Sequence, residues 1–504
     1  MKIAFRVDAS PKIGTGHFMR CLTLADALRQ QGAEIRFVSR RLPGHLLQML
    51  NLKAHEFAPL DSPALEECGR DLPHADWLET SQAQDAADTA HALSGHAWDW
   101  MVVDHYALDA RWEAMLRRSA ARIAVIDDIA DRRHDCDLLL DQNYHSDPGG
   151  RYRGKVPAQC DLLLGPRYAL LREEFRSIRE SVKPRAGDVQ RILVFFGGVD
   201  QGNYTGDAIE AIAALSIPGL KVDVVVGKSH PQREEIAAQS ERHGFACHVQ
   251  TPRMAELMAA ADLAIGAGGT AIWERCCLGL PALVSCVADN QGDQIAAAAS
   301  AGLLYAPDRS YDGAAWIQRH AAALIDNSSL REVISRTGMQ AVDGRGVWWV
   351  AGRLGCGDVE LRAASLDDAR NLFEWRNHPS VRAVSRSSEA IDWDTHRNWF
   401  TSVLNTPHRA LLIGERGGSA VGVVRFDMQG AEAEISIYLV PGVHPPGEGR
   451  ALLQSAERWL IANRPEVGRI LAQVLAGNER SERLFLGAGY HAERTHYEKR
   501  VGNP

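Results

Sequence analysis

The sequence predicts an α/β protein in three parts: two similar α/β domains that face each other, followed by a smaller α+β domain. Residues 1 to about 165 alternate short apolar runs with helical patterns, which is typical of a parallel sheet. A second series of this kind opens at residue 191, after a polar stretch with Pro and Gly over 181–188 that predicts a linker. From residue 359 the pattern changes to consecutive strand-like segments, two of them joined by a glycine turn. We therefore expect domains over 1–180, 187–350 and 358–504.

The composition narrows the class of protein. A chain of 504 residues is too long for one hydrophobic core, and 45% hydrophobic with 24% charged residues is ordinary for a globular protein. A formal net charge of -8 gives no support for nucleic-acid binding. There is no apolar run of membrane-spanning length, no signal-peptide pattern, and no Cys-x-x-Cys pair among the nine cysteines. We expect a cytoplasmic protein without a bound metal ion, and the oligomeric state stays open.

Polar residues follow several strands of the first domain. Apolar runs predict strands over 3–7, 35–39, 101–104, 123–126, 138–141 and 162–164. Asp104-His105-Tyr106 ends one of them, and parallel strands bring such ends to one crevice. For Asp127, Asp128 and Asp141, we favour the simpler hypothesis that each caps the turn or helix after its strand.

The segment from Arg6 to Cys21 is the first candidate for chemistry. It follows a predicted strand, Gly14 and Gly16 allow the backbone close to a ligand, and a helical pattern starts at His17 and ends at Gly32. His17 therefore lies at a strand-loop-helix turn, where open α/β sheets place ligands. The dinucleotide fingerprint is excluded because its third glycine is missing.

The string Arg6-Val7-Asp8-Ala9-Ser10, followed by Ile13-Gly14-x-Gly16-His17-x-Met19-Arg20-Cys21, resembles the start of the UDP-sugar hydrolases of the pseudaminic acid pathway. These enzymes are related to the MurG-type glycosyltransferases. The resemblance implies the GT-B architecture, with two Rossmann-like domains around a cleft, and it implies that His17 is the general base. An imidazole is a suitable base near neutral pH. It also implies that Gly14, Gly16, Arg20 and Tyr106 bind substrate. Tyr168 and Arg172 either line the cleft or lie on a solvated helix between domains.

The second domain carries Gly268-Gly269-Thr270, then Glu274, Gly279-x-Pro281 and Asn290-Gln291. A strand that runs into two glycines and a helix start presents open backbone amides, which can hold a diphosphate without a metal. This ordered string resembles the nucleotide-binding half of the MurG-type family. It implies that Gly269 and Thr270 bind the diphosphate, that Glu274 accepts the ribose hydroxyls, and that Asn290 and Gln291 contact sugar or phosphate. Trp273, Cys276 and Cys277 are expected to pack in the core.

The third domain has the order of segments of a GNAT acetyltransferase, and this resemblance spans about 358–500. Gly447-x-Gly449-Arg450 matches the loop that holds the acetyl-CoA pyrophosphate, although His444 replaces the usual arginine or glutamine. Asn478 and Ser481 are expected to bind the pantetheine arm. Phe485 replaces the usual tyrosine acid, so the general acid is open, with Tyr490 and Tyr497 as candidates and packing the simpler role for Tyr490. Trp375-Arg376-Asn377 and His396…Trp399-Phe400 resemble the pseudaminic-pathway branch and are expected to line the sugar pocket.

Together the two resemblances imply a bifunctional enzyme. The last domain would acetylate the 4-amino group of a UDP-linked amino sugar with acetyl-CoA. The first two domains would then hydrolyse UDP-2,4-diacetamido-2,4,6-trideoxy-β-L-altrose to UDP and the free sugar. Two alternatives stay open: a glycosyltransferase with a UDP-sugar donor, and a nucleotide-sugar sensor that binds without catalysis. The sequence does not determine the sugar's stereochemistry or whether product passes directly between the sites.

Overall fold

The computed structural model describes residues 1–61, 71–287, 292–307, 313–355, 359–385, 387–416, 419–442, 448–475, 477–493 and 496–500. The chain forms two compact units, with a boundary between Val350 and Ala351. The further division of the first unit near residue 180 stays a prediction.

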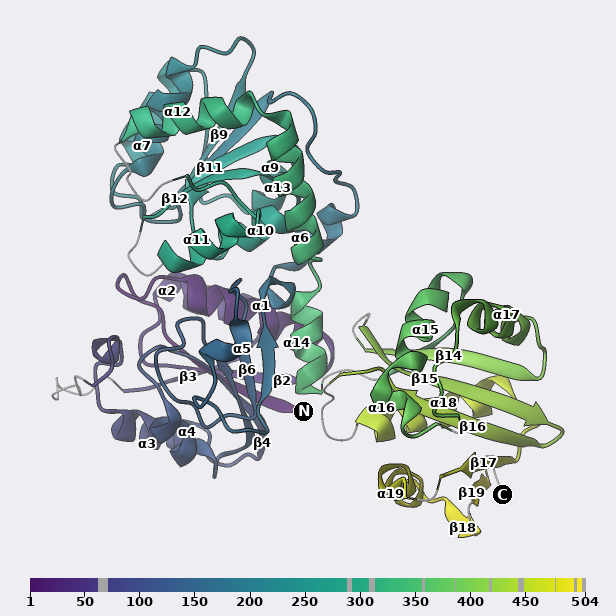
Figure 1. Cartoon of the computed structure of the whole chain (residues 1–504). Helices are drawn as coiled ribbons and strands as arrows, with labels where there is room; N and C mark the ends of the chain where they lie inside the picture. Colours follow the sequence, from purple (N-terminus) through teal and green to yellow (C-terminus); the bar gives the residue numbers. More distant parts are fainter. Residues whose placement is uncertain are drawn as a thin grey trace. The chain divides into compact units, whose positions relative to one another are not determined.

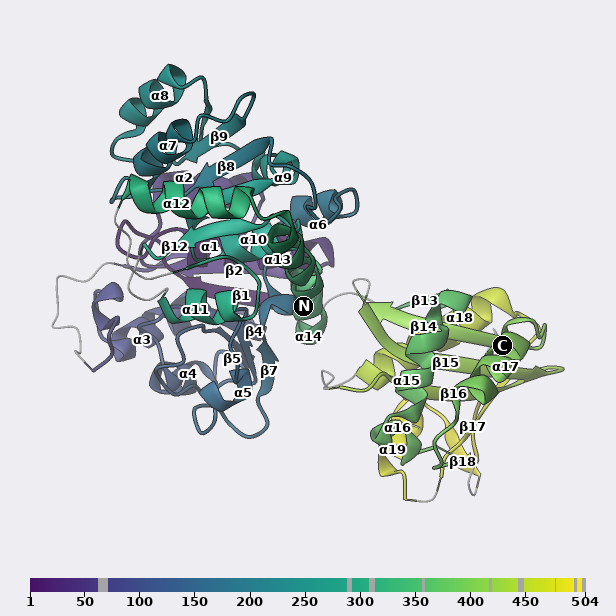
Figure 2. The same cartoon turned by 45° about the horizontal axis from the view of Figure 1, so that its top comes forward.

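The first sheet of the first unit is parallel throughout (Figures 1 and 2). Its order is β3-β2-β1-β4-β5-β6-β7, so the direction of winding reverses between β1 and β4. The strands are β1 Lys2–Val7, β2 Glu34–Ser39, β3 Glu56–Pro59, β4 Trp98–Asp104, β5 Ala120–Ile126, β6 Leu138–Asp141 and β7 Asp161–Leu164. All six predicted strands are present. The sequence missed β3, a short edge strand whose half-exposed residues give no buried apolar run.

Helices connect these strands. They are α1 Gly16–Gln30, α2 Gly44–Leu52, α3 Gln82–Ala92, α4 Ala110–Leu116 and α5 Pro148–Arg151, with a short 3-10 turn, η1, at Ala75–Trp77. α1 ends as predicted, because Gly32 has a φ of 86° that other residues adopt with strain. The reversal between β1 and β4 creates the crevice at the carboxyl ends of these two strands.

The second sheet of this unit is also parallel, with the order β10-β9-β8-β11-β12. Its strands are β8 Arg191–Phe195, β9 Lys221–Val226, β10 Ala246–Val249, β11 Leu263–Ala267 and β12 Ala282–Ser285. The helices are α6 Glu173–Arg179, α7 Tyr204–Ala214, α8 Arg233–Arg242, α9 Met254–Ala260, α10 Ala271–Cys277, α11 Gly292–Ser300, α12 Ala314–Ile325 and α13 Ser328–Ala341. The unit thus contains two parallel α/β sheets of the GT-B kind, as the sequence predicts.

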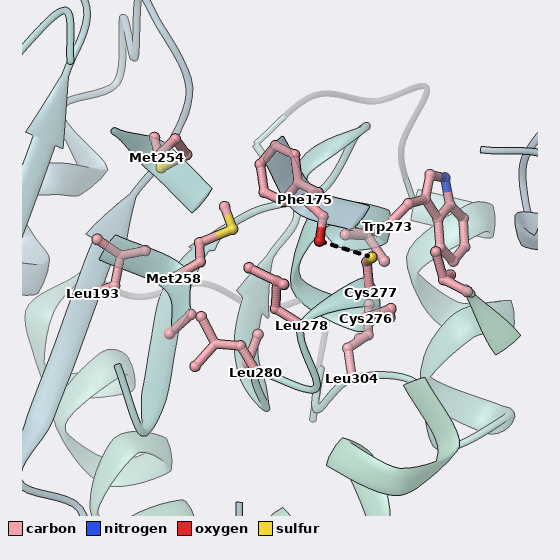
Figure 3. Packing of buried hydrophobic residues seen from close by; sticks show 14 of the residues in the cluster. Phe175, Leu193, Met254, Met258, Trp273, Cys276, Cys277, Leu278, Leu280 and Leu304 are labelled. Atoms are coloured by element: carbon pink, nitrogen blue, oxygen red, sulfur yellow. Dashed lines mark hydrogen bonds between the residues drawn. The ribbon is translucent and has the colours of Figure 1, made fainter. Parts of the chain in front are cut away.

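The core on one side of the second sheet includes a segment from before the predicted linker. Phe175 of α6 lies in this core with Met258, Trp273, Cys277 and Leu278 (Figure 3). Trp273 and Cys277 are fully buried, which confirms their predicted packing role. In the predicted linker, Arg185 donates to the backbone oxygens of Met258, Ala259, Ala261 and Leu278. This stretch is therefore anchored by hydrogen bonds to the second domain.

A third helix follows α12 and α13. This helix, α14, spans Gly346–Leu354 and crosses the boundary between the units. Gly346 packs so closely that a Cβ there would lie 2.2 Å from the carbonyl oxygen of Ala169. Arg167 lies over the ring of Trp349, with its guanidinium carbon 4.1 Å from the ring centroid. Gly344 and Gly346 thus serve close packing.

The second unit is built on a mixed sheet of order β13-β14-β15-β16-β17-β19-β18. Its strands are β13 Glu360–Ala363, β14 Arg409–Arg416, β15 Ser419–Gln429, β16 Glu432–Leu439, β17 Arg469–Gln473, β18 His491–Glu493 and β19 His496–Arg500. The helices are α15 Ala369–Asn377, α16 Pro379–Arg382, α17 Trp393–Leu404, α18 Glu448–Asn463 and α19 Glu479–Gly487. The predicted hairpin is formed by β14 and β15. Only β16 and β17 pair in parallel among the described ladders of this sheet.

Candidate functional site

His17 lies at the second position of α1 and faces the end of β4. Its Nδ1 atom is 2.6 Å from Oδ1 of Asp104, the last residue of that strand. The loop before α1 closes on itself, because the amide of Gly14 donates to the oxygen of Ser10 at 2.7 Å, with Gly14 at a φ of 81°. Among the described residues, none makes a hydrogen bond with Nε2 of His17. The tautomer with a proton on Nδ1 therefore leaves Nε2 as an acceptor.

Arg20, one turn along α1 from His17, donates hydrogen bonds to Asp104, the carboxylate that His17 also contacts. Its Nε and Nη2 atoms donate to Asp104 at 2.6 and 2.7 Å, and its Nη1 donates to Asp128 at 2.8 Å. Burial alone would raise the pKa of the Asp104 carboxyl, but Arg20 and His17 hold it well below its usual range. Asp104 thus stays ionised and accepts hydrogen bonds from both side chains. In this geometry Arg20 supports the base from behind.

The three aspartates interpreted as caps divide into two groups. Asp127 accepts a hydrogen bond from the amide of Ala130, and Asp141 accepts one from the amide of Asn143, as that hypothesis predicts. Asp128 instead pairs with Arg20 and accepts the hydroxyl proton of Tyr106. The capping role predicted for Asp128 is therefore incomplete. Its partner Arg20 lies on α1, far away in the sequence, so no local pattern indicates the contact.

Tyr106 lies beside His17, whereas His105 points the other way. The rings of Tyr106 and His17 meet edge to face, with centroids 4.6 Å apart. His105 accepts from the amide of Ala107 and lies 3.2 Å from Asp8, a partner of buried Arg6. Two further rings, His74 and Trp77, lie next to Tyr106. No pattern in the sequence marked these two residues, because they come from an irregular segment.

In the second domain, Gly269 and Thr270 lie between β11 and α10, and Glu274 lies one turn into the helix. Gly269 has a φ of 86°, which a side chain would strain. Glu274 is mostly buried, and burial raises the pKa of its carboxyl. Arg172 lies between two carboxylates, with its nitrogens 3.0 Å from Glu174 and 3.7 Å from Glu274. The structure thus brings Arg172 to Glu274.

The structure describes only some of the other residues predicted for this region. Tyr168 ends a 3-10 turn, η2, at Pro166–Tyr168, and is partly exposed. Asn290 and Gln291 lie outside the described residues. A residue that the sequence did not single out, Asn143, ties β6 to the second domain: its Oδ1 accepts from Trp273 Nε1 at 3.1 Å and from Gln294 Nε2 at 2.8 Å.

In the second unit, the predicted acetyl-CoA residues gather at the start of two helices. Gly449 and Arg450 lie in the first turn of α18, and Gly447 and His444 lie outside the described residues. Asn478 caps α19, where its Oδ1 accepts from the amide of Ser481 at 3.2 Å. In the described part of the chain the ladder between β16 and β17 ends at Ile435 and Ala472, although β16 runs on to Leu439. The strands thus cease to pair partway along the sheet.

Several predicted pocket residues of this unit have structural partners. The side-chain amide of Asn377 donates to the oxygen of Ile391 and accepts from its amide, both at 2.8 Å. His396 is buried and lies 3.0 Å from the oxygen of Ala369 through Nε2. Tyr490 is 2% exposed and packs against Phe485, consistent with packing, and its burial raises the pKa of its hydroxyl. The side chain of Tyr497 lies outside the described part.

Two features are absent from the part of the chain that the structure describes. Its residues hold no group of three or more His, Cys, Asp or Glu side chains arranged for a metal ion. Nor do they form a helix that is long and apolar enough to cross a membrane.

Fold and site together define an enzyme that joins a GT-B unit to an acetyltransferase domain. The family model "Acetyltransferase (GNAT) domain" matches residues 358–491. The first unit is homologous to the UDP-2,4-diacetamido-2,4,6-trideoxy-beta-L-altropyranose hydrolase of Campylobacter jejuni, with 24% identity over 245 residues that cover 48% of this chain and 76% of that one.

Two other relatives cover different shares of the chain. An uncharacterized protein of Methanocaldococcus jannaschii is 22% identical over 97% of this chain and 96% of its own. The spore coat polysaccharide biosynthesis protein SpsG of Bacillus subtilis is 29% identical over 39% of this chain and 59% of its own. Among solved structures, MurG of Acinetobacter baumannii is 15% identical, with a TM-score of 0.49, and covers 69% of this chain and 97% of its own.

Proposed function

We propose that the chain is a bifunctional enzyme of pseudaminic (nonulosonic) acid biosynthesis that processes one UDP-linked amino sugar in two steps. The second unit transfers an acetyl group from acetyl-CoA to the 4-amino group of the sugar. The first unit hydrolyses the product, UDP-2,4-diacetamido-2,4,6-trideoxy-β-L-altrose, to UDP and the free sugar. The substrate named for the C. jejuni relative carries both acetamido groups, which supports acetylation before hydrolysis.

The observation that carries the hydrolysis is the pair of His17 and Asp104. With Nδ1 hydrogen-bonded to Asp104, a carboxyl whose pKa Arg20 and His17 hold well below its usual range, the imidazole presents Nε2 as a proton acceptor. Water attacks the anomeric carbon, the bond from that carbon to the diphosphate oxygen breaks, and Nε2 takes the proton of the water. Asp104 stabilises the imidazolium that forms, and the diphosphate leaves with the bonding electrons. UDP and a free sugar are the products, and the proton held on Nε2 then passes to the solvent, which restores the base.

The second domain supports the nucleotide in this proposal. The amides of Gly269 and Thr270 face the diphosphate, and Glu274 accepts the ribose hydroxyls. Burial raises the pKa of the Glu274 carboxyl because it removes water from the charged group. The ribose hydroxyls would stabilise that carboxylate by replacing the lost water as hydrogen-bond donors. Arg172 neutralises the carboxylates on either side.

For acetyl transfer, the proposal places acetyl-CoA where β16 and β17 cease to pair. Gly449 and Arg450, at the start of the long helix α18, would face its pyrophosphate. Asn478 and Ser481, at the start of α19, would lie along the pantetheine arm. The attacking amine must be neutral, and the leaving thiolate needs a proton. The donor of that proton stays open, because Phe485 has none to give.

The experiment is a panel of UDP-sugars in water labelled with oxygen-18, with and without acetyl-CoA. We expect release of UDP together with one oxygen-18 atom in the free sugar, and greater release from the 4-amino substrate when acetyl-CoA is present. A glycosyltransferase would instead need an acceptor and leave the sugar unlabelled. Binding of UDP-sugar without turnover would favour the sensor.

A further inference from the structure

We propose that Trp77 and Tyr106 form an aromatic wall that binds a methyl group of the sugar, either the methyl of a 6-deoxy carbon or that of an N-acetyl group. The wall consists of these two residues, with His74 against both. It sets which UDP-sugars the site accepts. The inference rests on the proposed hydrolysis, since it assigns a subsite next to the proposed base.

The rings form one continuous cluster. Trp77 and Tyr106 stack at 25°, with centroids 5.4 Å apart. His74 lies 4.5 Å from the ring of Trp77 and 5.3 Å from that of Tyr106. His17 meets both wall residues edge to face, at 4.6 Å from Tyr106 and 6.1 Å from Trp77. A sugar that presents its anomeric carbon to His17 therefore lies beside these rings.

The wall is fixed in place on both sides. The Tyr106 hydroxyl donates to Asp128, and the Arg132 guanidinium lies 5.7 Å from the ring centroid. Trp77 ends η1, and its neighbour Asp76 pairs with Lys12 in the loop that leads to His17. This ion pair is exposed on both sides, and it joins the segment that carries Trp77 to the loop that leads to His17.

The chemistry of the wall selects against a hydroxyl group. Ring carbons offer no hydrogen-bond partner, so a hydroxyl pressed against them loses its water without compensation, whereas a methyl group gains contact. Polar groups gather instead behind His17, at Asp104, Arg20 and Asp128. Trp77 is only half-buried, so part of its ring can contact a substrate. The site thus has a charged side, which orients the base, and an apolar side suited to a deoxy or N-acetylated sugar.

The test compares matched substrates. One pair differs only at C6, as 6-deoxy against 6-hydroxy UDP-sugar, and a second pair differs as N-acetyl against N-formyl. The wild-type enzyme should prefer the methyl-bearing member of at least one pair by about 10- to 200-fold in kcat/KM. Trp77→Ala should reduce that preference to near one, and Trp77→Phe should keep part of it. The pair that loses its preference tells which methyl group meets the wall.

Trp98→Phe is the matched control, because Trp98 lies at the other end of β4 from Asp104. It should leave the preference unchanged. If Trp77→Ala and Trp77→Phe, both with an unchanged melting temperature, keep the full wild-type preference, the wall does not select the substrate. If the wild-type enzyme releases UDP from none of the sugars, the proposed hydrolysis fails instead. Calorimetric binding of the same pairs then tests the wall alone: equal affinity for both members would overturn it, and tighter binding of the methyl-bearing member would support it.

Discussion

The side-chain oxygen of Asn143 accepts a hydrogen bond from the indole of Trp273, 130 residues further along the chain, at 3.1 Å. The same oxygen accepts from Gln294. Asn143 follows β6 of the first domain, and Trp273 precedes Glu274 in α10. One buried amide thus links the strand ends near His17 to the helix proposed to hold the nucleotide.

We expect Asn143→Leu to lower the stability of the first unit by about 1–3 kcal/mol, because it leaves the buried indole N–H of Trp273 without its acceptor. Asn143→Asp keeps an oxygen at the same place and should lose much less. Thermal unfolding of both variants measures the difference. Equal destabilisation by Leu and Asp would show that the acceptor oxygen is not what matters.

His17→Asn should lower kcat for UDP release by about 10²–10⁴, since it removes Nε2, the proposed proton acceptor. UDP affinity should change little, because the other domain is proposed to hold the diphosphate, and acetyl transfer should persist. Steady-state kinetics and UDP titration check both points. A variant that releases UDP at nearly the wild-type rate would direct the search for the base to Asp104 or His105.

Asp104→Asn should also lower kcat, because the amide can no longer stabilise the imidazolium or fix its tautomer. KM should remain close to that of wild type, since Asp104 lies behind His17 and away from the substrate. Arg20→Lys keeps the charge but not the bidentate contact with Asp104, and we expect an intermediate kcat. A large rise in KM without a fall in kcat would assign Asp104 to substrate binding instead.

The stability of the fold should depend on pH through the protonation of His134. Burial alone would lower its pKa, but Glu113 and Asp127 raise it to about 9. An imidazole that binds its proton more tightly in the folded state stabilises the fold fully below its ordinary pKa near 6.5, and loses this contribution as the pH rises through 9. The loss is on the order of 3 kcal/mol. Melting temperatures from pH 6 to 10 should fall more for wild type than for His134→Gln, and parallel curves would contradict the assignment.

Gly449→Val should weaken acetyl-CoA binding and leave UDP release intact. A Cβ at this position would lie 3.7 Å from Leu484, an ordinary contact, so the fold should tolerate the change. The added bulk would stand where the pyrophosphate is proposed to approach. Gly447→Val, at the other glycine of the motif, should have the same direction of effect. Parallel loss of both activities, with the fold intact, would argue against two separate sites.

The sequence by itself determined the order of elements and the class of each unit. Strands such as β1, β4 and β8 are buried, and each shows in the sequence as a short run of apolar residues. The end of a helix can also be predicted locally, as at Gly32, because its backbone conformation favours glycine. The motifs around His17 and Glu274 are contiguous strings, so they too can be found without coordinates. The GNAT order of segments is likewise local information.

Only the tertiary structure decided which side chains meet. The sequence predicted only a capping role for Asp128. Its partners, Arg20 and Tyr106, belong to other segments of the chain, and the parallel sheet brings them close only in the folded protein. Trp77 carries no local signal for the same reason, and Asn143 is marked in the sequence only as a polar residue after a predicted strand. Each takes its role from residues that another strand or domain brings to it. Parallel sheets join distant segments at the ends of their strands. The residues of a site built there are therefore far apart in the sequence, and only folding brings them together.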